Sequence, residues 1–177
     1  MIHDDTYQWF AIHTKYKCEK FVREHLISQG IEAYVPVLKV KRQYVRKVKT
    51  AEIPLINCYA FVFISKSEYK QILQTPYVYG FVKTGDRIVS IPEREILLMK
   101  RVVGEKTNIR FEPTKWNTGD KVEVIGGNLT GMRGTLLRRN GKTEFIVELK
   151  TIGFQMHMLI EDQYLQKVAE ESLSMKS

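Results

Sequence analysis

The stretch Ile53–Ile64, IPLINCYAFVFI, is the longest run of apolar and aromatic residues in the chain. A short run rich in isoleucine, valine and aromatic residues, opened by a proline, predicts a buried β-strand. Because side chains alternate along a strand, both faces of this one are apolar. One face would carry Ala60, Val62 and Ile64, and the other Tyr59, Phe61 and Phe63. Such a strand is either covered on both sides inside a sheet, or one of its faces is kept for a partner.

The composition suits a globular protein of one or two small domains, with 177 residues of which 44% are hydrophobic. No run approaches the ~18 apolar residues that a membrane span requires. The acidic N-terminus, MIHDDTYQ, is unlike a basic signal peptide. With only two cysteines, Cys18 and Cys58, we expect a reduced, cytoplasmic protein without membrane association. Neither cysteine has a partner at metal-ligand spacing, so no metal or other cofactor is expected.

The positive charge is concentrated in the first part of the chain. Residues 1–104 hold 17 Lys and Arg against 10 Asp and Glu, whereas residues 105–177 hold 11 against 10. A localised cationic excess with a pI near 9.4 is typical of a protein that binds nucleic acid. Charge that serves only solubility is the plain alternative.

The first part predicts an α+β fold, in which a mixed or antiparallel sheet has flanking helices on one side. Strands are expected at residues 7–14, 31–40, 53–64, 77–82 and 87–90, and helices at residues 17–29, 65–74 and 92–103. Gly30 suits the left-handed position that ends a helix, and Ser65 with Glu68 forms a capping box. The apolar stripe of the first helix would consist of Cys18, Phe21, Val22 and Leu26.

A basic segment follows the second predicted strand. Six cations fall within eleven residues, and Tyr44 lies among them: Lys39, Lys41, Arg42, Arg46, Lys47 and Lys49. This pattern predicts a hairpin arm or a loop that follows a nucleic-acid backbone. A hairpin whose edge is protected by charge would also favour lysine, so both interpretations stay open.

The second part predicts short strands only. Residues 105–118 lack apolar periodicity and are expected to link a domain of residues 1–104 to an all-β domain of residues 119–168. Strands are expected at residues 121–125, 134–139, 143–150 and 154–161, with Asn140-Gly141 as a hairpin turn. About fifty residues of closely spaced strands predict a small barrel. Residues 169–177 are expected to form a flexible tail.

Two groups of motifs resemble one protein family. The second domain resembles a KOW module, an SH3-like barrel, in Gly119–Ile125, Gly131 and Gly134–Leu136. The first resembles the N-terminal domain of the NusG/RfaH family in Trp9–Lys15 with Glu19-Lys20, in Asn57–Val62, and in Gly80–Val82 followed by Pro92. Order and spacing agree across residues 7–168. Glu24-His25-Leu26 and Asn57-Cys58 are similar to the specialised paralogues of that family.

The resemblance implies a transcription elongation and antitermination factor that suppresses pausing or termination. It would bind the clamp helices of the largest subunit of bacterial RNA polymerase through His13, Tyr59, Phe61 and Phe81, although a core position is the alternative for Phe81. The non-template DNA strand would contact Lys15, Lys17, Lys20, Arg23, His25, Gln29, Lys41, Arg42, Gln74 and Thr75. For His25, a plain surface position is the alternative.

The resemblance also implies a role for the KOW domain. It would recruit a small-subunit ribosomal protein or the termination factor Rho through Ile152, Gly153 and Phe154, unless that loop only closes the barrel. β-Branched residues favour a stable barrel over the helical refolding that RfaH undergoes, and a monomer is implied. A ribosome-associated RNA-binding KOW protein is the rival interpretation. An enzyme is not expected, since no paired carboxylates or nucleophile motif occur.

Overall fold

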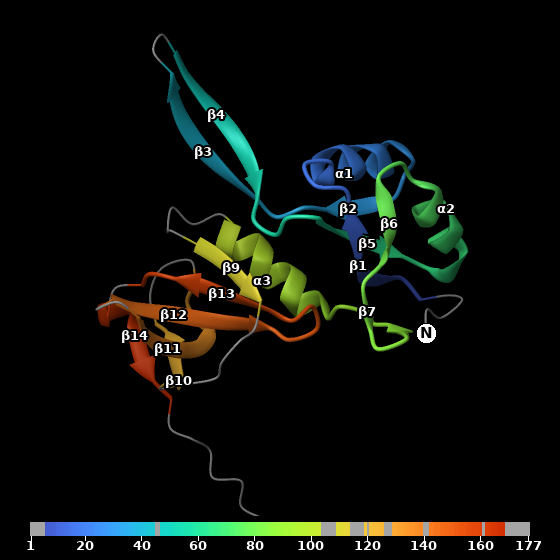
Figure 1. Cartoon of the computed structure of the whole chain (residues 1–177). Helices are drawn as coiled ribbons and strands as arrows, with labels where there is room; N and C mark the ends of the chain where they lie inside the picture. The colour runs from blue at the N-terminus through green and yellow to red at the C-terminus, as the bar shows by residue number, and fades with distance from the viewer. Residues whose placement is uncertain are drawn as a thin grey trace, which may run out of the picture. The chain divides into compact units, whose positions relative to one another are not determined.

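The apolar run contains strand β5 (Tyr59–Ile64), which lies inside a four-stranded antiparallel sheet of order β2-β5-β1-β6 (Figure 1). The computed structural model describes residues 6–44, 47–103, 109–113, 119, 121–125, 129–139, 142–160 and 162–168. The chain divides into two units, Met1–Val103 and Gly104–Ser177. The first combines a sheet with helices and the second is rich in strands, so the predicted α+β fold class is confirmed.

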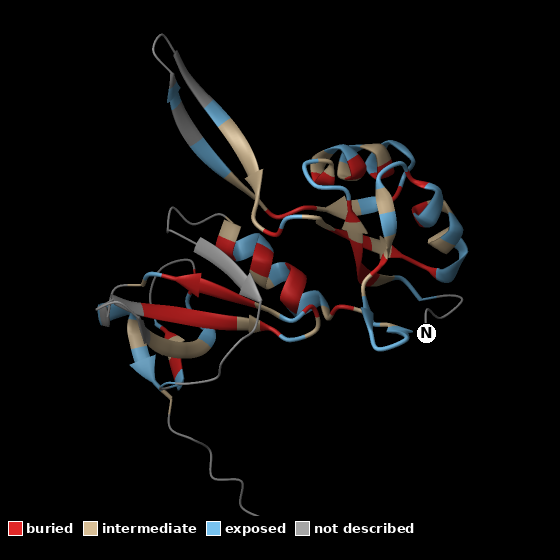
Figure 2. Cartoon of the chain, in the orientation of Figure 1, coloured by how far each residue is buried: buried red, intermediate tan, exposed pale blue. Residues whose placement is uncertain are grey.

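Strand β5 has a partner along each edge. On one side its full length pairs with residues 8–13 of β1, and on the other it pairs with the short β2. Strand β6 pairs with the far edge of β1. The other bounds in this sheet are β1 Gln8–Thr14, β2 Glu32–Tyr34 and β6 Val78–Phe81. Figure 2 shows that buried residues concentrate in the two central strands. The strand predicted from Ile53 is shorter than expected, because the chain turns at residues 55–58 and Cys58 adopts a φ of 65°.

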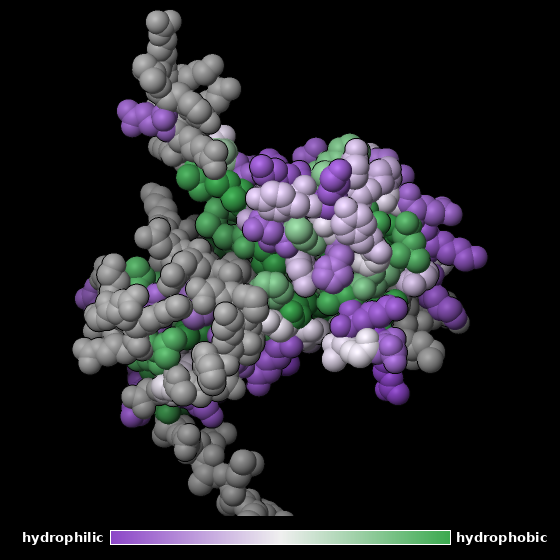
Figure 3. Space-filling view, viewed as in Figure 1, coloured by the Kyte–Doolittle hydropathy of each residue, from purple (hydrophilic) through white to green (hydrophobic). Residues whose placement is uncertain are grey.

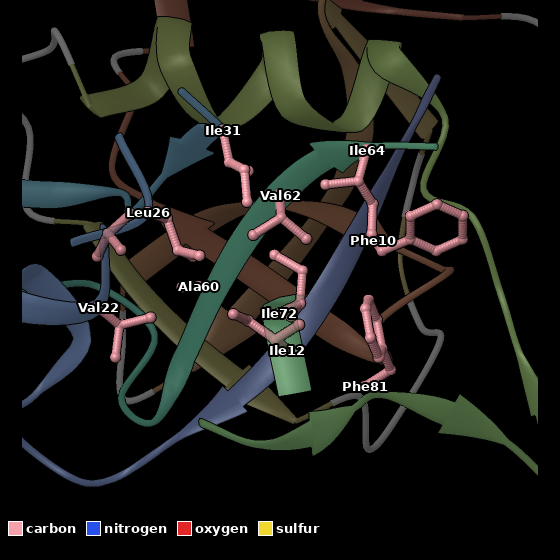
Figure 4. Packing of buried hydrophobic residues seen from close by; sticks show 11 residues of the cluster. Phe10, Ile12, Val22, Leu26, Ile31, Ala60, Val62, Ile64, Ile72 and Phe81 are labelled. Carbon is pink, nitrogen blue, oxygen red and sulfur yellow. The ribbon is translucent and has the colours of Figure 1, made fainter. Parts of the chain in front are cut away.

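Helices α1 (Glu19–Ser28) and α2 (Tyr69–Gln74) cover one face of this sheet. Val22 and Leu26 of α1 and Ile72 of α2 are fully buried against Ile12 and Val62 (Figure 4). Each such side chain stabilises the fold by about 1.5–3 kcal/mol relative to an exposed one.

The predicted helix ends are confirmed. Gly30 has a φ of 84°, and the Ile31 amide donates to the Leu26 carbonyl at 3.0 Å. The capping box of Ser65 and Glu68 opens a short 3₁₀ turn, η1 (Lys66–Glu68), directly before α2.

Helix α3 (Glu93–Val103) corrects the expectation that all helices lie on one side of the sheet. Its Lys100 ammonium lies over the rings of Trp9 and Tyr34, 5.3 and 5.4 Å from their centroids. These rings belong to the face that α1 and α2 leave uncovered. The physical reason is that both faces of β5 are apolar, so each gains from being removed from water.

The basic segment forms the predicted hairpin arm. Pro36 separates β2 from β3 (Val37–Tyr44), which splits the single strand predicted for residues 31–40. Strand β3 pairs with β4 (Lys47–Pro54) in a two-stranded sheet of its own, and the arm projects from the first unit (Figure 1). At its root the Leu55 amide donates to the Pro36 carbonyl at 2.8 Å. Hydrophobic groups gather on the visible surface where the arm joins the sheet (Figure 3). A second small hairpin, β7 (Lys83–Thr84) and β8 (Arg87–Ile88), precedes α3.

The second unit contains a six-stranded antiparallel sheet of order β14-β10-β11-β12-β13-β9. Its strands are β9 Ile109–Pro113, β10 Lys121–Val124, β11 Arg133–Arg139, β12 Lys142–Leu149, β13 Phe154–Met158 and β14 Leu165–Lys167, with a 3₁₀ turn η2 at Asp162–Tyr164. Arg139 pairs with Lys142, as a two-residue hairpin requires, although Asn140 and Gly141 lie outside the described residues. The tail predicted for residues 169–177 also lies outside them.

Strand β9 corrects the predicted linker of residues 105–118. Its five residues pair in register with β13, with Phe111 opposite Met156. Ile109 and Phe111 alternate with Arg110 and Glu112, which is a period-two pattern too short to stand out in the sequence. The open edge of β13 supplies the hydrogen-bonding partner that this segment lacks on its own.

Two glycines of the KOW-like pattern lie where the backbone of another segment leaves no room for a side chain. A Cβ on Gly119 would overlap the Leu136 carbonyl, and one on Gly134 would overlap the Ile146 carbonyl. Gly131, by contrast, has open space around it but a φ of 82°. Glycine is therefore required for two reasons in this pattern. At Gly119 and Gly134 another backbone segment approaches too closely for a side chain, and at Gly131 the backbone is left-handed.

We predict that Gly134→Ala destabilises the second unit more than Gly131→Ala does. The first sets a Cβ against the Ile146 carbonyl and the Phe145 ring and forces backbone displacement, at the upper end of the about 1–3 kcal/mol that overpacking costs. The second adds only the left-handed penalty of about 1–2 kcal/mol. Urea denaturation followed by circular dichroism measures both. The reverse order of stabilities would contradict the close approach of β11 and β12.

Candidate functional site

His13 and Tyr59 lie directly opposite each other on β1 and β5, at one end of the aromatic face of the sheet. Their ring centroids are 4.7 Å apart with the rings tilted by 59°, and both side chains are half-buried. Burial, with a smaller electrostatic effect of Cys58, raises the pKa of the Tyr59 phenol. The structure thus brings together two of the four side chains predicted to bind polymerase.

Phe61 lies on the same face but is fully buried beside Tyr34, at a centroid distance of 6.3 Å. Phe61 is a packed core residue two positions from Tyr59 on the same face of β5, and none of its own surface is exposed. The Tyr34 hydroxyl is buried without a hydrogen-bond partner among the described residues, and burial raises the pKa of its phenol.

Phe81 corrects the predicted grouping. It pairs with Ile12, so it faces the helices and not the side of Tyr59. Its ring packs edge-on against Phe10 at 6.1 Å and stacks on Tyr69 at 4.9 Å, and only 6% of the residue is exposed. The core position that the sequence left open for Phe81 is therefore the one the structure shows.

The aromatic face continues beyond the predicted residues. Trp9 and Phe63 pair across β1 and β5 with a centroid distance of 5.3 Å, and Tyr7 lies 5.7 Å from Phe63 at the far end. The alternation places Trp9 with His13 and Phe63 with Tyr59, but it does not predict that Trp9 and Phe63 contact each other or that Tyr7 joins them. The signal was the alternation Trp9, Ala11, His13 opposite Phe63, Phe61, Tyr59.

Lys15 and Lys17 are the most exposed of the predicted DNA-contacting cations whose side chains are described. They lie in the tight turn between β1 and α1, where Lys17 adopts a φ of 64° and the Cys18 amide donates to the Lys15 carbonyl at 3.0 Å. Lys20 and Arg23 are partly neutralised, since Lys20 lies 3.8 Å from Glu52 and Arg23 3.2 Å from Glu24. The free positive charge therefore gathers at the turn rather than along the helix.

A hydrogen-bonded relay connects the exposed sides of α1 and α2. The Gln71 amide donates to the Gln29 side-chain oxygen at 3.2 Å, and the Gln29 amide donates to His25 Nε2 at 3.1 Å. Two of the predicted residues, His25 and Gln29, are thus brought together.

The two predicted residues at the end of α2, Gln74 and Thr75, differ in exposure. Gln74 is exposed, but Thr75 is buried and its hydroxyl donates to the Gln71 carbonyl at 3.0 Å. The structure therefore does not present Thr75 to a ligand. Its hydroxyl satisfies a carbonyl at the end of α2, as threonine often does near helix ends.

Phe21 corrects the predicted apolar stripe of α1. It is exposed and contacts His25 and Tyr77, while Val22 and Leu26 fill the core. Its spacing from Leu26 spans a turn and a half of helix, which places Phe21 outside the buried sector.

The strand register of the arm separates Lys41 from Arg42. Lys41 pairs with Thr50, and Arg42 pairs with Lys49, so the two cations belong to opposite faces of the hairpin. Their side chains lie outside those that the structure describes.

The loop predicted to recruit a partner of the second unit is only partly exposed. Ile152 is buried, Phe154 is half-buried, and Gly153 is exposed with a φ of 68°. Val122, Val124, Ile146 and Val147 are all buried in the sheet, as the prediction of a stable β-unit requires. Buried Glu144 and His157 also pair in this unit, with 3.1 Å between Oε2 and Nδ1.

Neither a membrane span nor a metal cluster is found in the described parts of the chain. None of the helices assigned there is long and apolar enough to cross a bilayer. A search of the same residues finds no group of three or more His, Cys, Asp or Glu side chains able to hold a metal ion.

Comparisons with known proteins identify one family and several solved structures that are similar to this chain. The family described as "Transcription termination factor nusG" matches residues 7–100, which is more than half of the chain. The solved structure titled "Domain interaction in Thermotoga maritima NusG" matches with 20% identity and a TM-score of 0.59, covering 93% of this chain and 98% of that one. A chain of the MjSpt4:Spt5 complex matches with 19% identity and a TM-score of 0.29, covering 91% and 98%. The Thermotoga match supports the fold.

We predict that Phe81→Ala lowers the free energy of unfolding by about 3–5 kcal/mol, the usual cost of truncating a buried phenylalanine. Tyr79→Ala, two residues away and 71% exposed, is the matched control and should cost about 0.5 kcal/mol or less. Thermal and urea unfolding measure both. Equal stabilities for the two variants would show that Phe81 is not a core residue.

Proposed function

Because the chain belongs to the NusG family of transcription factors, we propose that it is an elongation and antitermination factor of bacterial RNA polymerase. It would bind the clamp helices of the largest subunit, contact the non-template DNA strand, and suppress pausing or termination as a cytoplasmic monomer. The family is non-enzymatic, and we propose the same for this chain, without a cofactor.

The observation that carries this proposal is the half-exposed pair of His13 and Tyr59. Both side chains are fixed by the two central strands of the sheet, so little conformational freedom is lost when a partner covers them. A few aromatic side chains of this kind can supply most of the binding energy of an interface. We propose that His13 and Tyr59 contact the clamp helices directly. Phe61 would support Tyr59 from below, and Phe81 would act only by holding the sheet.

The proposed DNA contact would lie next to the proposed polymerase contact, at the turn between β1 and α1. Lys15 follows His13 by two residues, and its exposed ammonium lies beyond the end of the sheet. Lys15 and Lys17 would bind phosphates without regard to sequence, with Lys20, Arg23, Lys41 and Arg42 adding to the field. His25, Gln29 and Gln74 would face the bases.

The second unit would recruit a small-subunit ribosomal protein or Rho. Gly153 and Phe154 offer the exposed and half-exposed part of the loop, while Ile152 anchors it in the sheet. A glycine in a left-handed conformation allows the chain to turn sharply at its tip.

We predict that Tyr59→Ala and His13→Ala each raise the protein concentration needed for half-maximal pause suppression on the order of tenfold, as truncation of an interface hot spot does. In vitro transcription with purified polymerase on a pausing template provides the measurement.

Tyr7→Ala is the matched control, since Tyr7 is an exposed ring at the opposite end of the same face. It should act like the unmodified protein. Full activity of both the Tyr59 and His13 variants would place the polymerase contact elsewhere.

We also predict that the double variant Lys15→Gln/Lys17→Gln reduces the salt dependence of DNA affinity. Each phosphate contact to a single strand contributes about 0.7 to the slope of log affinity against log salt, so the slope should fall by roughly 1.4. Titration of a single-stranded oligonucleotide at several salt concentrations measures it. Lys83→Gln/Arg87→Gln, which removes two exposed cations from β7–β8, should leave the slope unchanged. Equal slopes for all three proteins would exclude the β1–α1 turn as a phosphate site.

A further inference from the structure

Glu19 is a carboxylate in the first turn of α1, and only 1% of the residue is exposed. Burying a charged group costs free energy unless another group compensates it. A compensating hydrogen bond comes from a distant segment, because the Cys58 amide donates to Glu19 Oε1 at 2.8 Å. Hydrogen bonds to an ionised acceptor are stronger than neutral ones. Glu19 is therefore a strong acceptor held directly beside the start of β5.

The backbone of Cys58 is left-handed. Its φ is 65°, a value at which the Cβ of an L-residue crowds the following carbonyl oxygen. Glu19 accepts from the amide of this residue, and the Thr14 amide donates to its carbonyl at 2.8 Å. Thr14 and Glu19 lie on either side of the tight turn between β1 and α1. The two ends of this turn therefore hold Cys58 by both of its backbone groups.

The conformation of Cys58 determines how β5 begins. Tyr59 is the first residue of β5, and its pair with His13 is the last of the ladder with β1. On the other edge, β2 pairs only with residues 61–63 and does not reach Tyr59. The sheet thus fixes Tyr59 from its C-terminal side, and Cys58 fixes it from the N-terminal side. The contact of the Tyr59 and His13 rings, at 4.7 Å, depends on both.

We propose that Glu19 is a positioning residue for the polymerase contact, which holds Cys58 left-handed so that Tyr59 stays against His13. The inference rests on the proposed function for the identity of the partner. Glu19 is buried and touches no partner itself, so its effect reaches the surface through the backbone of Cys58. The competing explanation is that Glu19 only stabilises α1, because a negative charge near the N-terminus of a helix is favourable.

The test measures how tightly full-length variants bind purified bacterial RNA polymerase core enzyme without nucleic acid. Glu19→Ala should weaken binding roughly tenfold, the factor by which a non-glycine residue disfavours the left-handed region. Glu24→Ala is the matched control, because it removes the same charge from an exposed position of α1, and it should bind like the unmodified protein. Equal losses for the two variants would overturn the proposal, since the lost charge would then be the cause.

Cys58→Gly separates positioning from a loss of helix stability. Glycine adopts a φ near 65° without the steric penalty, so the double variant Glu19→Ala/Cys58→Gly should regain most of the lost affinity. A weakened α1 would not be repaired by a change in another segment. If Glu19→Ala alone does not fold, the glycine should restore folding as well. Absence of rescue, in affinity or in folding, contradicts the positioning role.

A spectroscopic measurement follows the ring contact in the absence of polymerase. Nuclear Overhauser effects between the ring protons of His13 and Tyr59 should be present in the unmodified protein, weaken in Glu19→Ala and return in the double variant. The methyl signals of the core residues Ile12 and Val62 should stay unchanged in all three proteins. Ring contacts that persist at full strength in Glu19→Ala would show that Glu19 does not position Tyr59.

The binding measurements also separate this inference from the proposed function. If Tyr59→Ala binds polymerase as tightly as the unmodified protein, the proposed function fails, and the role of Glu19 in binding is overturned with it. If Tyr59→Ala weakens binding and Glu19→Ala does not, the proposed function stands and the positioning role alone is overturned.

Discussion

Burial of both faces of β5 is the constraint on which the first unit depends. The face of Val62 is sealed by α1 and α2, and on the other face Trp9 and Phe61 are also buried. A strand with two apolar faces has no stable position at the edge of a protein, so the chain must supply cover from both directions. The part of this face that remains for the proposed polymerase contact is therefore one end of the sheet and not a whole face of it.

The backbone at that end of the sheet adopts left-handed conformations that non-glycine residues rarely adopt. The three non-glycine residues with positive φ among the described ranges, Lys17, Cys58 and Tyr77, all adjoin it. The Cys58 carbonyl accepts from the Thr14 amide at 2.8 Å, and the Cys58 amide donates to buried Glu19 at 2.8 Å. Burial and the nearby Glu19 carboxylate raise the pKa of the Cys58 thiol, which keeps it uncharged. Such conformations persist only where surrounding contacts over-determine them, and they cluster where partners bind.

The features that the sequence predicted correctly are those determined by neighbouring residues along the chain. Period-two alternation identified β1 and β5 and assigned their faces, and the capping box and Gly30 fixed helix ends. It could not predict that Phe81 faces the helices, because that depends on its pairing with Ile12, a residue sixty-nine positions away. It placed Phe21 on the apolar stripe of α1 because Cys18, Phe21, Val22 and Leu26 follow helical spacing. It missed β9 because five residues carry too little pattern without the edge of β13 to pair with.

The arm formed by β3 and β4 is independent of the main sheet in its hydrogen bonding. Strands β3 and β4 satisfy their hydrogen bonds with each other and not with the main sheet, and the chain closes at the root through the Pro36 carbonyl and the Leu55 amide. Beyond that closure, the Lys20–Glu52 ion pair ties the arm to α1. Length and residue composition can thus vary from Lys39 outward without disturbing the core. The hairpin is therefore a separate structural module, and its sequence is constrained by its own two-stranded ladder rather than by the buried sheet.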